Sequence, residues 1–170
     1  MRTRIVGTAI QNSFTQVKNE WILHLVSPQG EEIFLQLSCH PRFPFVILND
    51  SIKRQQNSTT VLEELLALRI SDLQIMPGER ILRMDFDDSE LKLIIHLFTS
   101  NSNFFIVGKN HLIINSFKKS KALKQTTYSV PENSQADITS LSSSQFLEMV
   151  ESDAEKALAK FLKKSFFQLN

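Results

Sequence analysis

The sequence has little of what many secreted proteins and enzymes need. Cys39 is the only cysteine among 170 residues, so no internal disulfide can form and no cysteine pair can bind zinc, which favours a reducing, cytoplasmic compartment. There are only four glycines, and neither a Gly-x-Gly-x-x-Gly nor a phosphate-loop spacing occurs, so a nucleotide cradle is not expected. A run of about 18 apolar residues and an export signal are also missing, so we expect neither a membrane protein nor a secreted one.

Catalytic and metal-binding patterns are absent as well. The histidines are scattered, so they do not form the converging set that a metal site needs: His24, His40, His96 and His111. The Gly-x-Ser-x-Gly motif that carries the nucleophilic serine of α/β-hydrolases does not occur. Cys39 adjoins His40, but adjacent side chains of a strand point to opposite faces, which argues against a nucleophile and base pair. We therefore expect no cofactor, no metal and no enzymatic activity.

Charge is nearly balanced over the chain but clustered locally. Lysine and arginine total 19 against 18 acidic residues, a net charge of +1, so overall charge does not indicate a nucleic-acid partner. Locally, Arg80 follows a Pro-Gly turn at the start of an apolar run, and Lys118, Lys119 and Lys121 follow another such run. Positive groups on a rigid scaffold are suited to phosphate contacts. The alternative for the lysines is an ordinary solvated loop.

Short runs of β-branched and aromatic residues dominate the first two thirds of the chain. Seven such runs, separated by turn residues, are typical of antiparallel strands joined by hairpins. They are residues 21–27, 31–38, 43–49, 80–86, 91–98, 103–108 and 111–117. The pattern predicts an α+β protein whose main unit is a β-rich antiparallel sheet or sandwich.

One helix is expected between the strands. Thr59 or Thr60 can cap the segment 61–70, "VLEELLALRI", in which the apolar residues follow a helical stripe. This stripe predicts a single helix packed on the sheet.

The last third of the chain differs in composition and in residue pattern. Residues 119–143 are polar, and we interpret them as a connector. From 144 to 170, apolar residues recur every three or four positions, with acids first and lysines last, which predicts a long amphipathic helix. The predicted divisions are thus 1–118, 119–143 and 144–170. The apolar face of the helix is expected to pack on the β unit or on a second copy, as a homodimer.

Several segments, taken in order, resemble a known family. They are residues 4–25, 32–48, 61–86, 91–119 and 127–150, together with "ALAKFLKKSFFQL" at the end. "TSNSNFFIV" at 99–107 and the Tyr-x-x-Pro that starts at Tyr128 are part of the same pattern. Their order is similar to the NFACT amino-terminal domain, the leading domain of proteins labelled fibronectin-binding protein A-like. The resemblance implies a β-rich unit similar to the amino-terminal domain of formamidopyrimidine-DNA glycosylases, followed by a helical segment.

The resemblance also implies partners. Family members act in ribosome-associated quality control and bind the large ribosomal subunit that carries an obstructed nascent peptidyl-tRNA. In bacteria they recruit alanyl-tRNA, so that an alanine tail is added to the stalled nascent chain. The Asp-Arg motif of the family, which is implicated in tRNA contact, aligns with Glu79-Arg80. A carboxylate beside a guanidinium can orient it towards a phosphate or base. We therefore expect Glu79, Arg80 and the three lysines 118, 119 and 121 to contact RNA.

Two other functions stay open at this stage. One is a protein-interaction or adhesion module, as the fibronectin-binding label suggests. The other is a degenerate glycosylase-like domain that binds nucleic acid, although those enzymes use an N-terminal Pro-Glu for imine chemistry and this chain begins Met1-Arg2-Thr3.

Overall fold

The computed structural model describes residues 1–76, 79–98, 101–130 and 142–152. The chain divides into two compact units, one made of 1–76 with 80–129 and the other of 77–79 with 130–170. The first unit contains the ten described strands, and the second contains helix α3 (Ser143–Ser152). Among the described residues, no helix is both long enough and apolar enough to cross a membrane.

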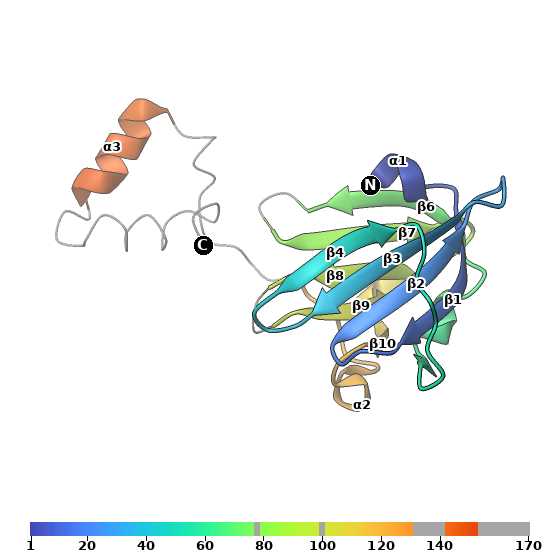
Figure 1. Cartoon of the computed structure of the whole chain (residues 1–170). Helices are drawn as coiled ribbons and strands as arrows, with labels where there is room; N and C mark the ends of the chain where they lie inside the picture. The colour runs from blue at the N-terminus through green and yellow to red at the C-terminus, as the bar shows by residue number, and fades with distance from the viewer. Residues whose placement is uncertain (77–78, 99–100, 131–141, 153–170) are drawn as a thin grey trace. The chain divides into compact units, whose positions relative to one another are not determined.

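The first unit consists of two antiparallel sheets of five strands (Figure 1). Sheet A has the order β4-β3-β2-β1-β5, and sheet B has the order β10-β9-β8-β7-β6. The strands of sheet A are β1 (Ala9–Thr15), β2 (Glu20–Val26), β3 (Glu32–Cys39), β4 (Pro44–Asn49) and β5 (Thr59–Thr60). The strands of sheet B are β6 (Ile70–Ile75), β7 (Ile81–Phe86), β8 (Lys92–His96), β9 (Asn103–Val107) and β10 (Ile113–Ser116). The predicted β-rich antiparallel unit is therefore confirmed.

All seven runs that predicted strands form strands, but the sequence analysis did not predict three further strands. They are β1, β5 and β6. In β1 the register against β2 shifts between Ile10 and Asn12, so the alternation of buried and exposed residues is interrupted by a bulge. Strand β6 also has a register shift, between Ile70 and Asp72. Polar residues also interrupt both strands, whose sequences are AIQNSFT and ISDLQI, so neither shows the dense run of β-branched and aromatic residues on which the prediction depends.

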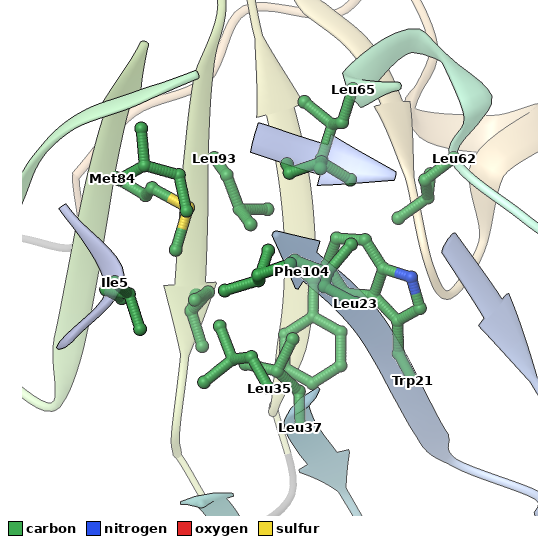
Figure 2. Close-up of a cluster of buried hydrophobic side chains, with 14 of the residues drawn as sticks. Ile5, Trp21, Leu23, Leu35, Leu37, Leu62, Leu65, Met84, Leu93 and Phe104 are labelled. Atoms are coloured by element: carbon green, nitrogen blue, oxygen red, sulfur yellow. The ribbon is translucent and has the colours of Figure 1, made fainter. Parts of the chain in front are cut away.

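The main hydrophobic core lies between the two sheets (Figure 2). Trp21 from sheet A is fully buried, and its ring centroid lies 5.6 Å from that of Phe104 in sheet B. The indole Nε1 donates a hydrogen bond of 2.9 Å to Ser13 Oγ, which satisfies its only polar group. Burial of these side chains on both inner faces supplies the main stabilisation of the sandwich.

The predicted helix over 61–70 is wrong. The structure has only a 3-10 turn, η1 (Glu63–Leu65), and Leu62 and Ala67 on either side have positive φ angles of 52° and 64°. These left-handed residues break any helix. Instead, the Ala67 N–H donates to the Ile10 carbonyl at 2.8 Å, so the segment crosses from sheet A to sheet B beside β1. The leucine spacing is explained by Leu62 and Leu65, which both point into the core.

The unit also contains two short helical turns, α1 (Arg2–Ile5) and η2 (Lys109–His111). Helix α1 is held by ion pairs from Arg2 to Asp72 at 2.8 Å and from Arg4 to Asp50 at 2.7 Å. The 3-10 turn η2 joins β9 to β10. The ion pairs tie the N-terminus to a strand of sheet B and to the end of β4.

The β unit continues beyond Lys118. Helix α2 (Ser120–Leu123) follows β10, and the chain then pairs through the bridge between Leu112 and Thr127. Tyr128 is buried. The first part of the expected connector, 119–143, therefore packs on the sheet as far as Ser129, whereas 131–141 lies outside the described residues.

Helix α3 agrees with the first part of the predicted C-terminal helix. Ser142 and Gln145 form a capping box: the Gln145 N–H donates to Ser142 Oγ at 3.3 Å, and the Ser142 N–H donates to Gln145 Oε1 at 2.9 Å. Helix α3 is described from Ser143 to Ser152, and the remainder of the predicted helix, 153–170, lies outside the described residues. The long helix, the homodimer and the glycosylase-like resemblance stay predictions.

Candidate functional site

Antiparallel pairing collects the predicted basic residues at one end of sheet B. Strand β7 begins at this end, β8 ends opposite it, β9 begins there and β10 ends there. Arg80 precedes β7 and Lys118 follows β10. Three strand spacings separate these two positions, about 14 Å. Residues that are 38 positions apart in the chain therefore share one surface.

Arg80 is exposed and its backbone is fixed. Its carbonyl oxygen accepts a hydrogen bond of 2.9 Å from the Leu97 N–H, which extends the ladder between β7 and β8 by one residue. The next residue, Ile81, is fully buried. The Arg80 Cα is thus anchored in the sheet while its side chain extends to the surface.

Glu79 is half-buried and belongs to the second unit. Burial raises the pKa of its carboxyl above the usual value, because partial removal of water disfavours the charged form. The expectation that this carboxylate orients the Arg80 guanidinium stays a prediction, since the two residues fall in separate units.

Lys118 is used inside the protein. Its Nζ donates to the carbonyl oxygens of Cys39 at 2.5 Å and Ser102 at 3.2 Å. The side chain of Asn103 binds the backbone of Lys118 on both sides, accepting from its N–H at 2.8 Å and donating to its carbonyl at 3.1 Å. This network joins the end of β3 in sheet A to the ends of β9 and β10 in sheet B. We assign the Lys118 ammonium a structural role, which leaves it poorly placed to bind phosphate.

Lys119 and Lys121 are exposed at the same end of β10. Lys119 has a positive φ of 58° at the start of α2, and its carbonyl accepts from the Leu123 N–H at 3.1 Å. Neither lysine forms an ion pair within the part of the chain that the structure describes. Both ammonium groups are therefore available for an anionic partner.

The structure adds a turn that the sequence analysis did not select. Because Lys118 Nζ binds the Cys39 carbonyl, the turn between β3 and β4 lies beside the end of β10. This turn, "HPRFP", exposes His40, Arg42 and Phe43. The signal was present in the sequence as a cation and an aromatic residue between two prolines. We call the exposed cations Arg42, Arg80, Lys119 and Lys121, with this turn, the basic end.

The same turn excludes a cysteine and histidine pair. Cys39 is buried, its Sγ donates to the Asn19 carbonyl at 3.3 Å, and burial raises the pKa of its thiol. His40 is exposed, and its Nδ1 accepts from the Arg42 N–H at 3.2 Å. The thiol and the imidazole thus have separate partners. The described residues also contain no cluster of three or more metal-ligating side chains.

A family profile and three solved structures match the chain. The profile described as NFACT N-terminal and middle domains covers residues 1–169. The N-terminal domain of the fibronectin-binding protein PavA from Streptococcus pneumoniae has a TM-score of 0.75 at 20% identity, over 97% of this chain and 69% of that chain. No curated protein matches the sequence.

Two further structures that match come from Staphylococcus aureus and Streptococcus suis. The fibrinogen binding protein from Staphylococcus aureus has a TM-score of 0.77 at 17% identity, over 96% of this chain and 64% of that chain. The N-terminal part of the fibronectin/fibrinogen-binding protein from Streptococcus suis has a TM-score of 0.71 at 20% identity, over 95% of this chain and 68% of that chain. These similarities show a shared fold, and the S. aureus chain extends well beyond the length that this chain spans.

Proposed function

The chain belongs to the family of NFACT N-terminal and middle domains, as its sequence motifs predicted, and from this premise we propose that it is a noncatalytic RNA-binding module. Its proposed partners are tRNA and the large ribosomal subunit, in the cytoplasm. Its proposed place is in a ribosome-associated quality-control factor that tails stalled nascent chains.

The exposed guanidinium of Arg80 carries this proposal. The guanidinium is planar and can donate two parallel hydrogen bonds to a phosphate or to the edge of a base, and here its backbone is fixed by the sheet. Arg42, Lys119 and Lys121 add positive charge at the same end of the sandwich. A local cluster of this kind supports RNA binding even though the net charge of the chain is only +1.

Binding of labelled tRNA by the full chain, followed by fluorescence anisotropy at several salt concentrations, tests the proposal. Arg80→Ala is expected to weaken binding and to lower the slope of log K against log salt by about 1, because one phosphate contact is lost. Arg80→Lys keeps the charge but not the fork, so an intermediate loss would indicate a bidentate contact.

The matched control is Lys109→Ala. Lys109 is an exposed cation in η2, at the opposite end of sheet B, where it pairs with Glu90 at 3.2 Å. Its loss is expected to leave tRNA binding unchanged. If Lys109→Ala and Arg80→Ala weaken binding equally, binding depends on total charge and Arg80 is not a specific RNA contact.

A protein-binding module is the second candidate, because the three structural relatives described above are named for binding fibronectin or fibrinogen. Surface plasmon resonance with purified fibronectin and fibrinogen separates the two functions. Saturable binding of either protein that is insensitive to Arg80→Ala, together with no binding of tRNA, would favour this candidate over RNA binding.

A further inference from the structure

Phe43 differs from the other described phenylalanines. Its side chain is 71% exposed, whereas the rest are buried or half-buried. A single exposed apolar side chain is common on protein surfaces and needs no function. Phe43 is distinguished by how firmly its turn is held and by which side chains surround it.

Local chemistry holds the turn in one conformation. His40 and Phe43 each precede a proline, and such residues are restricted to extended backbone conformations. The Arg42 N–H donates to His40 Nδ1 at 3.2 Å. The His40 and Phe43 rings lie nearly parallel, 21° apart, with centroids separated by 6.1 Å. An aromatic ring held in this way loses little conformational freedom when a ligand binds it.

Exposed cations lie at the same end of the sandwich as Phe43. Arg42 is its neighbour in the chain, and the Lys118 contact to the Cys39 carbonyl brings Lys119 to the same end of the sandwich. An exposed aromatic ring with cations around it is the combination that proteins use for single-stranded RNA, where the ring stacks on a base and the cations contact the phosphates.

We propose that Phe43 stacks on an unpaired base of the bound RNA, while Arg42 and Lys119 contact the flanking phosphates. This inference rests on the proposed RNA-binding function and adds the form of RNA that the basic end recognises, a single-stranded segment. Because every base has a π face, the contact does not depend on base identity.

Four variants of the full chain test the stacking contact, with a short uridine oligonucleotide, an abasic chain of the same length and tRNA as probes. Phe43→Ala is expected to weaken binding of the oligonucleotide by about tenfold or more. Phe43→Leu should lose as much, because leucine has no π face, and Phe43→Trp should keep or raise the affinity. Leu112→Ala, an exposed apolar residue at the opposite end of sheet B, should have no effect.

Salt dependence separates stacking from phosphate contacts. Phe43→Ala should change the affinity but not the slope of log K against log salt, since no charge is removed. The abasic chain should bind the wild type and Phe43→Ala equally. Because Phe43 and Leu112 are both exposed, all four variants should have the melting temperature of the wild type.

Each alternative result has a defined consequence. Wild-type RNA binding that Phe43→Ala leaves unchanged would overturn the stacking contact and keep the proposed function. Full affinity in Phe43→Leu would also overturn it, in favour of an apolar contact. No RNA binding by the wild type would overturn both proposals. A loss in Phe43→Ala with none in Arg80→Ala would support stacking and remove the Arg80 assignment.

Discussion

His96 in β8 and Tyr128 after α2 meet on the face of sheet B that points away from the core between the sheets. The imidazole Nε2 lies 2.8 Å from the Tyr128 hydroxyl, and both residues are buried. Tyr128 packs there with Ile81, Ile94, Val107 and Ile113 in a second hydrophobic cluster. The segment from Lys119 to Ser129 therefore belongs to the β unit, and Tyr128 covers part of the outer face of sheet B.

Two substitutions of Tyr128 should destabilise the β unit to different extents. Tyr128→Phe keeps the ring and loses the hydrogen bond, so we expect the free energy of unfolding to fall by about 1 kcal/mol. Tyr128→Ala also opens a cavity, and the expected loss is about 3 kcal/mol. Urea denaturation followed by the fluorescence of Trp21, the only tryptophan, measures both. Equal stability of all three proteins would contradict the packing of this segment.

Stability should also depend on the protonation of His96. Burial lowers its pKa from 6.5 to about 4, so the unfolded chain binds a proton at a higher pH than the folded chain does. The free energy of unfolding should therefore fall as the pH decreases from about 6.5 to about 4, by roughly 3 kcal/mol in total. Above pH 6.5 both states are neutral at this position, and the effect should vanish.

His96→Gln provides the comparison for this pH dependence, because glutamine can still bond the Tyr128 hydroxyl but does not titrate. The difference between wild type and variant, measured by urea denaturation at each pH, isolates His96 from the carboxyl groups. The same slope in both proteins between pH 6.5 and pH 4 would show that His96 is not responsible.

Replacement of Lys118 should lower stability, whereas replacement of Lys119 should weaken RNA binding. Lys118→Met removes the donor to the Cys39 and Ser102 carbonyls, and we expect a loss of about 1–3 kcal/mol in unfolding free energy. Lys119→Met removes only an exposed charge, so its stability should change by less than about 0.5 kcal/mol. Its tRNA binding should weaken and become less salt-dependent. If Lys118→Met weakens binding at unchanged stability, the structural role of Lys118 is refuted.

Glycine should have opposite effects at two exposed alanines. Ala67 has a φ of 64°, where a Cβ is strained, so Ala67→Gly should raise the unfolding free energy by about 0.5–1 kcal/mol. Ala122 lies in helix α2, where glycine loses more conformational entropy on folding than alanine does. Ala122→Gly should therefore lower the unfolding free energy by about 0.5–1 kcal/mol. Thermal melting compares the two. Destabilisation by both would contradict the left-handed conformation at Ala67.

The sequence predicted much of the fold but only part of the site. Strands such as β2 and β3 were found because each is a dense run of apolar, β-branched and aromatic residues between turn residues, and both strands are buried over most of their length. The segment 61–70 was misassigned because its leucines have helical spacing, whereas hydrogen bonds to β1 hold it in another conformation. For the site, the basic positions were evident, but which of them reach solvent was not.

The order of apolar and polar residues by itself determined that this chain forms antiparallel strands and belongs to its family. Only the tertiary structure decided that Lys118 ties two sheets together while Lys119 beside it stays exposed, and that Phe43 is exposed at the same end of the sandwich. The reason is physical: a strand depends on neighbours along the chain, whereas the availability of a charge or a ring depends on carbonyls and side chains that are brought from distant segments by folding.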